Sequence, residues 1–558
     1  MMKHAFSSIQ RPAVIEDMSS DYFDVLIIGG GITGAGIALD AQTRGMKTGL
    51  IEMQDFAAGT SSRSTKLIHG GLRYLKQFEI KEVAEIGKER AVVYENAPHV
   101  TTPLWMLLPV IKGGSFSKLT LRLGLTVYDR LAGVKRSERH YMLNKKETLN
   151  KVSFLSKKIK GGGYYVEYRT DDARLTLEVM KKAIEHGVKA ANYLKADEFI
   201  YEDGQVKGVH AVDQLTGERH LIRANKVINA AGPWVDTLRE KDQSKKGATL
   251  HLTKGVHFTI DQKYFPLEQA VYFDEPEGRM IFAIPREGKV YIGTTETDEF
   301  GNIMNLRMNT NDRDYLLKAI QFMFPAANVK KENIESSWAG VRPLVQEEGK
   351  DLSEISRQDE TFVSDSDLIS IAGGKLTGYR KMAERVVDLT AKKLRGEKGE
   401  KYPKCRTKQL RLSGGDVGGA NKFTEFVEEK IRQGTTIGLS SEEAKQLAHR
   451  YGSDVGDVYN IIQTRGEEAK HHQLSQAVFA MVVYGLEHEM TVTPADFFIR
   501  RSGALFFHID WVIQWKDPVI EYMAQRLQWT EEQRKAHKDY LNEYIHEAAV
   551  AKEPKENS

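Results

Sequence analysis

The chain has 558 residues, which exceeds the size of one ordinary hydrophobic core and predicts two or three domains. Its 41% hydrophobic and 28% charged residues are typical of a soluble globular protein and exclude a disordered or membrane-spanning chain. The formal charge of +3 provides no general attraction for nucleic acid. The single cysteine, Cys405, cannot form an internal disulfide, which indicates a reducing compartment such as the cytoplasm.

Neither a targeting segment nor a membrane span is predicted. The first 21 residues include acidic side chains and have no continuous apolar stretch, so we expect residues 1–21 to form a flexible N-terminal arm. The apolar run at residues 477–486 has ten residues, fewer than the ~20 that a bilayer requires, and predicts a core helix.

Residues 22–52 predict a strand, a glycine-rich turn, a helix and a second strand. The first strand is continuously apolar at its end, as interior parallel strands are, and apolar side chains then recur with helical spacing. Gly29, Gly31 and Gly34 complete the pattern G-x-G-x-x-G, which places a helix N-terminus against a pyrophosphate. Glu52 follows 18 residues after Gly34, at the spacing of a carboxylate that accepts ribose hydroxyls and repels a 2′-phosphate. The segment predicts a site for an adenine dinucleotide.

Two further junctions between a strand and a glycine turn follow, at residues 226–236 and 368–380. Together with the first, they indicate one nucleotide-binding domain assembled from separate segments within residues 22–395. The run at residues 59–75 adds hydroxyl and backbone N–H groups that suit a cofactor phosphate or ring edge. Outside the first glycine turn, the predicted cofactor contacts are Thr60, Ser61, Ser62, Lys66, His69, Gly70, Ala231, Gly232, Trp234, Gly374, Leu376 and Thr377.

The remaining segments predict two other kinds of structure. Residues 270–295 contain three short strands separated by turns, which indicates an antiparallel meander. We expect it to belong to a substrate-binding sheet, inserted around residues 241–335, that forms a platform over the cofactor. Helical patterns dominate from residue 396 onward, so residues 396–558 predict a separate helical domain.

Four motifs are longer and more specific than a nucleotide fingerprint. They are the run at 59–75, Asn229-Ala-Ala-Gly-Pro-Trp234, Gly340-Val-Arg-Pro-Leu344 and Gly373-Gly-Lys-Leu-Thr377. In these motifs the chain resembles the FAD-dependent glycerol-3-phosphate dehydrogenases of the aerobic, respiratory kind. The resemblance covers nearly the whole chain, including the late segment at residues 496–503.

The resemblance implies an α/β fold with FAD as cofactor. The expected architecture is an FAD-binding Rossmann-like domain of the glutathione-reductase and D-amino-acid-oxidase type, an antiparallel-sheet substrate domain and an all-α C-terminal domain. The implied reaction is oxidation of sn-glycerol 3-phosphate to dihydroxyacetone phosphate by hydride transfer to FAD. A respiratory quinone is the implied electron acceptor.

A substrate with a phosphate dianion requires several cations in one cavity, preferably arginines that bind phosphate oxygens in pairs. The predicted substrate-binding residues are Arg73, Tyr74, Thr295, Arg342, Arg357 and Lys375. The helix that opens near Lys375 is expected to stabilise the reduced flavin ring. His257 and His69 are the candidates for the base that accepts the substrate hydroxyl proton, and a buried structural role remains open for each. Arg342 is the alternative, holding a developing alkoxide, so the predicted catalytic residues are His257, Arg342 and Lys375.

A quinone acceptor implies contact with a membrane. Residues 112–139 combine basic residues with leucine, valine and aromatic side chains, which suits a segment attracted to anionic lipid. A packed helix with a basic outer face is the alternative interpretation. The protein is therefore expected in the cytoplasm, attached peripherally to the inner face of the cell membrane.

Two other functions remain open from the sequence. A glycerol-3-phosphate oxidase would share these motifs and reduce oxygen, although its known members carry an insertion that is not recognised here. A non-catalytic flavin-binding scaffold would need no second anion site beside the ring. No metal site is predicted, because His471, His472 and His488 lack ligand spacing with cysteine or acidic partners. The sequence does not decide whether the chain forms a homodimer.

Overall fold

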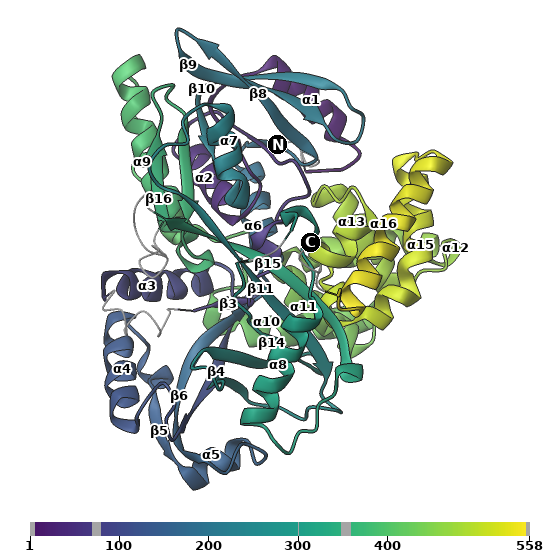
Figure 1. Ribbon diagram of the computed structural model, residues 1–558. Helices are drawn as coiled ribbons and strands as arrows, with labels where there is room; N and C mark the ends of the chain where they lie inside the picture. Colours follow the sequence, from purple (N-terminus) through teal and green to yellow (C-terminus); the bar gives the residue numbers. More distant parts are fainter. Residues whose placement is uncertain (1–5, 70–79, 299–300, 347–358, 554–558) are drawn as a thin grey trace.

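Two β-sheets and a body of helices make up the residues that the computed structural model describes, which are 6–69, 80–298, 301–346 and 359–553 (Figure 1). The first sheet lies in the upper part of Figure 1, the second sheet lies below it, and most of the late helices form the body at the right. The predicted α/β class with a helical C-terminal part is confirmed.

The first sheet contains the predicted nucleotide-binding elements. Its strands run in the order β16-β17-β10-β1-β2-β7, with β9 paired to β10 and β8 to β9. Strands β7, β2, β1, β10 and β17 are parallel, so the glycine turns after β1, β10 and β17 lie at one edge, and the predicted convergence of three separate segments is confirmed. The strands are β1 (Tyr22–Ile28), β2 (Thr48–Ile51), β7 (Lys189–Ala191), β8 (Leu194–Glu202), β9 (Gln205–Asp213), β10 (Arg219–Asn229), β16 (Asp359–Val363) and β17 (Ile369–Gly373).

Glycines let the first helix approach this sheet closely. Gly29 has φ of +119°, a conformation that side chains disfavour. A Cβ at Gly34 would lie 1.9 Å from the carbonyl oxygen of Gly29, so only glycine brings the helix so near the end of β1. The helices of this part are α2 (Ile32–Thr43), α3 (Ile80–Asn96), α6 (Asp172–Glu185), α7 (Val235–Lys241) and α9 (Tyr379–Lys398).

The second sheet has the order β15-β11-β14-β13-β12-β4-β6-β3, with β5 paired to β6. The predicted antiparallel meander is confirmed as β12, β13 and β14. The sheet is larger than the predicted insertion around 241–335, because β3 to β6 come from residues 67–170 and β15 ends at Gln346. Its strands are β3 (Leu67–Ile68), β4 (Thr101–Ile111), β5 (Tyr141–Asn144), β6 (Ile159–Thr170), β11 (Thr249–Asp261), β12 (Ala270–Asp274), β13 (Met280–Arg286), β14 (Lys289–Gly293) and β15 (Ile334–Gln346). Its helices are α4 (Lys118–Leu131), α5 (Lys145–Lys151) and α8 (Thr310–Met323).

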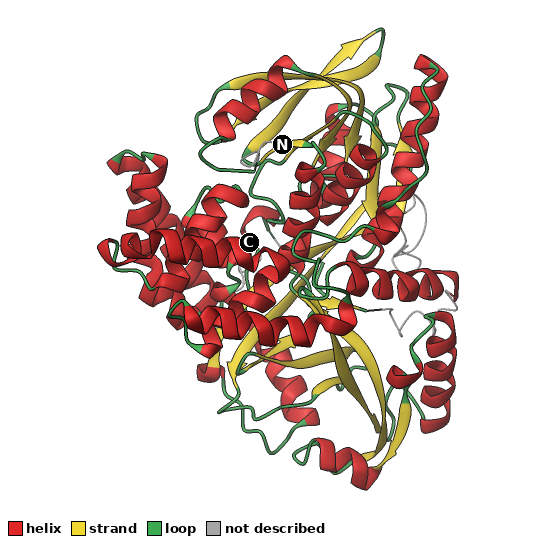
Figure 2. Ribbon diagram, turned by 180° about the vertical axis from the view of Figure 1, so that it is seen from behind, coloured by secondary structure: helices red, strands yellow, loops and turns green. Residues whose placement is uncertain are grey.

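The late helices gather on one side of both sheets, as the view from behind shows (Figure 2). They are α10 (Phe423–Thr436), α11 (Ser441–Tyr451), α12 (Val455–His471), α13 (Gln476–His488), α14 (Ala504–Phe507), α15 (Ile509–Leu527) and α16 (Glu531–Ala549), with a π-helix, η12 (Asp496–Arg501), before α14. The run at 477–486 is buried within α13, as predicted for a core helix. Within the described part of the chain, no helix has the length and apolarity to cross a bilayer.

The prediction of a flexible N-terminal arm is wrong for residues 6–20. Helix α1 (Arg11–Ser20) has a proline, Pro12, at its second position, within the first turn where proline is tolerated, and packs on the first sheet. Arg11 is buried and forms a bidentate ion pair with Asp213 at 2.8 and 3.0 Å, and Ser8 donates to the carbonyl of Thr491. These partners lie hundreds of residues away in the sequence, so local composition gave no sign of them.

Candidate FAD and substrate site

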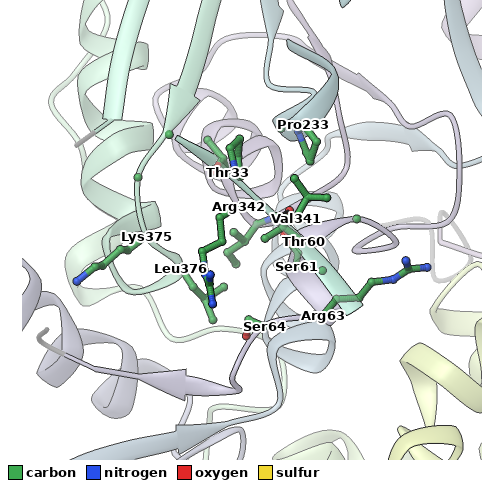
Figure 3. Close-up of a pocket in the computed structure, with 18 of the residues that line it drawn as sticks. Thr33, Thr60, Ser61, Arg63, Ser64, Pro233, Val341, Arg342, Lys375 and Leu376 are labelled. Carbon is green, nitrogen blue, oxygen red and sulfur yellow. Dashed lines mark hydrogen bonds between the residues drawn. The ribbon is translucent and has the colours of Figure 1, made fainter. Parts of the chain in front are cut away.

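A cavity of about 670 Å³ lies where the glycine turns of the first sheet meet one face of the second sheet. It is lined by the turns after β1, β10 and β17, by residues 58–61 and 63–65, and by strands β6, β11, β13 and β15. Figure 3 shows Thr33, Pro233, Val341 and Leu376 around the same space, although these residues lie far apart in the sequence. The fold therefore joins the predicted nucleotide site, at the glycine turns, to a space against the second sheet within one cavity.

One end of the cavity is built for the adenosine and pyrophosphate of a dinucleotide. The carboxylate of Glu52 accepts hydrogen bonds from the backbone N–H groups of Gly30 at 2.6 Å and Gln54 at 2.8 Å, which fixes its orientation. Burial raises the pKa of Glu52 above its ordinary value, and the two backbone N–H groups oppose that effect. Gly31 caps the N-terminus of α2, where Ser61 accepts a hydrogen bond from the N–H of Ile32 at 3.0 Å. The helix N-terminus thus faces the cavity as an anion site.

Arg342 lies at the other end, on β15. Its Nη2 donates a hydrogen bond of 2.9 Å to the hydroxyl of Thr294, which directs the guanidinium along the cavity wall. A Cβ at Gly255, on the neighbouring strand, would lie 2.8 Å from Arg342 Nη2, so this glycine leaves room for the guanidinium. Figure 3 shows the Arg342 side chain running toward Ser64 and Leu376.

His257 is buried beside Arg342, on β11. Its Nε2 lies 3.0 Å from the hydroxyl of Thr65, and its ring stacks on Trp338 with centroids 5.0 Å apart. The ring passes over Gly293, where a Cβ would lie 2.1 Å from His257 Cδ2. Burial, reinforced by Arg342 and Lys66, lowers the pKa of His257 well below its ordinary value. The imidazole is therefore neutral at pH 7 and able to accept a proton.

His69 and Lys375 lie together on a further part of the wall. Burial first, then the charges of Lys375, Arg342 and Arg90, lower the pKa of His69 to about 3. The backbone oxygen of His69 accepts a hydrogen bond from the hydroxyl of Thr377. In Figure 3 the Lys375 side chain extends away from the group around Thr60 and Ser61. The positive charges of Lys375, Arg342 and Arg90 therefore act together on this part of the wall.

The structure brings most of the predicted site residues to this one cavity. The cavity wall includes Gly29, Gly31, Glu52, Thr60, Ser61, His69, Ala231, Gly232, Trp234, His257, Thr295, Arg342, Gly374, Lys375, Leu376 and Thr377. Gly34 lies behind the wall, where it permits the close approach of α2 to β1. The predicted residues Gly70, Arg73, Tyr74 and Arg357 lie outside the described part of the chain.

Two predicted cofactor contacts, Lys66 and Ser62, do not line the cavity. Lys66 does not line the cavity, because its ammonium is buried in an ion pair with Asp172 at 2.6 Å and also donates to the carbonyl of Ser62. Ser62 is likewise absent from the wall, since the short helical turn η1 (Thr60–Ser62) directs it inward while Ser61 faces the cavity. Both residues lie in a motif that predicted cofactor contacts, but the sequence does not show in which direction each side chain points.

Sequence reasoning also missed several residues of the wall. Thr65 forms a hydrogen bond with His257, and Thr294 accepts one from Arg342. In the sequence, only their position beside predicted site residues could have indicated them. Glu167 lines the cavity from β6, buried and bound by Tyr128 and Arg90 at 3.1 and 3.2 Å. In the sequence, Glu167 could have been recognised as a carboxylate within a predicted strand rich in aromatic residues.

The shape and the donors of the cavity fit FAD. A long space begins at a fixed carboxylate suited to ribose, passes a helix N-terminus suited to pyrophosphate, and ends in a chamber with cationic residues. A family model described as FAD dependent oxidoreductase matches residues 24–378. The chain belongs to this family. A second model, described as the C-terminal domain of alpha-glycerophosphate oxidase, matches residues 405–534.

Relatives within the family match the chain over its full length. The aerobic glycerol-3-phosphate dehydrogenase of Bacillus subtilis (strain 168) is 57% identical over 551 residues, covering 99% of both chains. That of Staphylococcus haemolyticus (strain JCSC1435) is 56% identical, covering 98% of this chain and 99% of the relative. The crystal structure of the glycerol-3-phosphate dehydrogenase from Bacillus halodurans complexed with FAD has a TM-score of 0.85 at 51% identity, covering 98% of this chain and 99% of that one. FAD is therefore the cofactor of this chain.

Proposed function

We propose that the chain oxidises sn-glycerol 3-phosphate to dihydroxyacetone phosphate and passes the electrons to a respiratory quinone. The observation that carries the proposal is the pairing of Arg342 with a neutral, buried His257 at one end of a cavity that fits FAD. A phosphorylated alcohol requires a cation for its phosphate and a base for its hydroxyl proton, and this end of the cavity has both. The names of relatives at 56–57% identity support the choice of substrate.

Arg342 and Lys375 are proposed to bind the substrate phosphate. The guanidinium is fixed by Thr294, so it loses little conformational freedom when it binds two phosphate oxygens. Lys375 adds a second positive charge from the turn between β17 and α9. Both charges also stabilise the alkoxide that develops at the substrate C2 oxygen as its proton leaves.

The oxidation removes a hydride from C2 and a proton from its hydroxyl, leaving a carbonyl. FAD supplies the acceptor for the hydride when it is bound. His257 accepts the proton, because its pKa is lowered enough to keep it unprotonated and Thr65 with Trp338 fixes its ring. His69 is the alternative base, since its pKa of about 3 keeps it neutral as well.

Anaerobic reduction of the bound flavin tests the proposal. Glycerol 3-phosphate should bleach the yellow flavin, whereas glycerol, which lacks the phosphate, should not at the same concentration. His257→Gln should slow the bleaching strongly, while His69→Gln should leave it nearly unchanged. Flavin that stays oxidised with glycerol 3-phosphate would overturn the assignment, and a slow step only in His69→Gln would transfer the role of base to that residue.

We further propose that the outer face of α4 binds an anionic membrane. Residues 112–139 include seven basic and two acidic residues, and two leucines on the outer face of α4, Leu119 and Leu123, are 77% and 64% exposed. On the inner face Tyr128 donates to Glu167 at the cavity wall, so a membrane bound here lies one helix away from the cavity. This arrangement suits electron transfer to a quinone dissolved in lipid.

Vesicle binding and acceptor choice test this second proposal. We expect the protein to cosediment with phosphatidylglycerol vesicles at low salt, and the double variant Leu119→Ser/Leu123→Ser to remain in the supernatant. Ile513→Ser, which removes an exposed side chain from distant α15, is the matched control and should bind as the unaltered protein does. Equal binding by all three proteins contradicts a role for α4. Peroxide formation in place of quinone reduction would identify an oxidase.

We also propose that residues 22–395 act as the oxidoreductase core and residues 396–558 as a helical domain. The two family models support this division, because their matches end at 378 and begin at 405. The helical patterns predicted after residue 396 agree with α10 to α16.

A further inference from the structure

The helical domain makes a fully buried ionic contact with the nucleotide-binding part. Arg500 and Arg501, the last two residues of the π-helix η12, are only 5% and 1% exposed. Arg501 forms a bidentate pair with Asp55 at 2.7 and 2.9 Å, and the Nε of Arg500 donates to the same carboxylate. Both arginines are thus held by one acidic residue that lies 445 and 446 positions earlier in the chain.

Asp55 belongs to the short loop that begins with Glu52. The loop is held by backbone hydrogen bonds, since the N–H of Tyr193 donates to Gln54 at 2.8 Å and that of Leu194 donates to Glu52 at 2.7 Å. Asn192 donates to Asp55 Oδ1 at 2.9 Å. The carboxylate that faces the ribose end of the cavity and the carboxylate that receives two arginines are therefore three residues apart on one braced loop.

The charges of this cluster are balanced within the protein interior. Burial opposes ionisation of Asp55, but Arg501 and Arg500 outweigh it and lower its pKa to about 2. Arg500 also pairs with Asp496, whose Oδ1 accepts a hydrogen bond from Tyr193 at 2.7 Å. Buried ion pairs of this kind contribute little net stability, yet removal of one partner leaves an uncompensated charge. Their value lies in fixing the position of the loop.

We propose that Asp55, clamped by Arg500 and Arg501, positions the loop of Glu52 and thereby sets the affinity of the protein for the adenosine half of FAD. The helical domain then acts in cofactor retention, a role that does not depend on the proposed substrate or electron acceptor. Asp55 is a positioning residue, because it does not line the cavity itself, whereas Glu52, Met53 and Gln54 of the same loop do. Glu52 also responds to the clamp electrostatically, since Asp55 raises its pKa and Arg500 lowers it.

Asp55→Asn is the variant that tests the clamp. We expect its dissociation constant for FAD to rise about 10- to 100-fold. The magnitude is taken from metal sites, where removal of a residue that supports a ligand lowers metal affinity by a similar factor. The flavin-reduction rate of the FAD-saturated variant should stay near that of the unaltered enzyme. In the double variant Glu52→Gln/Asp55→Asn, the loss of affinity should be smaller than the sum of the two single effects, because both act through one loop.

Asp454→Asn is the matched control. Asp454 accepts from Lys181 at 2.6 Å and from Ser413 at 2.9 Å, in a second ionic contact between α6 and the helical domain that does not involve the loop of Glu52. It should lower the melting temperature and leave the affinity for FAD unchanged. If Asp55→Asn is insoluble, Arg500→Lys keeps the charge and removes the planar fork, and should weaken FAD binding in the same direction.

The outcomes separate this proposal from the proposed function. An unaltered FAD affinity in folded Asp55→Asn overturns the clamp, as does an equal loss of affinity in Asp454→Asn. Failure of glycerol 3-phosphate to reduce the flavin of the unaltered protein would overturn the proposed function and leave these FAD affinities as they are.

Discussion

Gly293 offers a direct test of the position of His257. A Cβ at residue 293 would lie 2.1, 2.6 and 2.7 Å from Cδ2, Cγ and Nε2 of the imidazole. Carbon atoms in contact are about 3.5 Å apart or more, so in Gly293→Ala the ring must retreat by about 1.4 Å. The stacked ring of Trp338 limits the retreat on the other side, and the 3.0 Å hydrogen bond to Thr65 is lost.

A displacement of this size should slow the chemical step more than it weakens cofactor binding. Misplacement of a reacting group by ~1 Å costs on the order of 100-fold in rate, and we expect that loss in Gly293→Ala. Gly293 does not line the cavity, so the FAD content of the purified variant should be unchanged. Anaerobic stopped-flow measurement of flavin reduction by glycerol 3-phosphate gives the rate, and the absorbance ratio of flavin to protein gives the content.

Two further variants decide what the result means. Gly301→Ala is the control, because a Cβ there meets no atom of the described residues within 4 Å, and it should reduce flavin at the unaltered rate. The double variant His257→Gln/Gly293→Ala should be no slower than His257→Gln alone. A normal reduction rate in Gly293→Ala with full FAD content would refute the reasoning, since the clash would then have no effect on the reacting base.

Two other predictions concern charge in the cavity. Arg342→Lys keeps the positive charge but loses the planar guanidinium, so kcat/KM for glycerol 3-phosphate should fall about 10- to 100-fold. Arg63→Ala is the control, because the Arg63 side chain points away from Arg342 in Figure 3, and its kcat/KM should stay near the unaltered value. The pKa of His69 is about 3 in the folded protein and 6.5 ordinarily. Between these pH values the unfolded chain binds a proton at His69 that the folded protein does not bind. The free energy of unfolding should therefore fall as the pH drops below 6.5. Chemical denaturation at pH 5 and 7 should show a smaller loss in His69→Gln, by up to ~1.4 kcal/mol per pH unit, and an equal loss in both proteins would contradict the assignment.

The edge of the first sheet was predictable because glycine patterns report backbone geometry. Gly373 and Gly374 have φ of +75° and +80°, and such positions are recognisable wherever a strand ends in a turn. The same holds for the cavity contacts at Ser61 and Trp234, which lie within motifs of this kind. The resemblance to a known family then indicated the cofactor, which backbone patterns alone do not identify.

Other parts of the structure depend on partners that are distant in the sequence. The Lys66 side chain points away from the cavity because it forms a buried ion pair with Asp172, which lies 106 residues later in the sequence. Arg11 orders the N-terminal segment because Asp213 lies 202 residues away. No periodicity or spacing near Lys66 or Arg11 contains this information, so their environments could be learned only from the folded chain.

The strand order of the first sheet has a consequence during synthesis on the ribosome. Residues Ile228 and Asn229 of β10 pair with Ile369 and Ser370 of β17, so about 140 residues must emerge after β10 before its second parallel neighbour exists. Until then the last residues of β10 have a partner only in β1, because β9 pairs with no more than the first part of the strand. Such an unpaired apolar segment is the kind of exposed edge that promotes misassembly. A chaperone that shields growing chains should therefore affect the yield of this protein most while residues 230–370 are being translated.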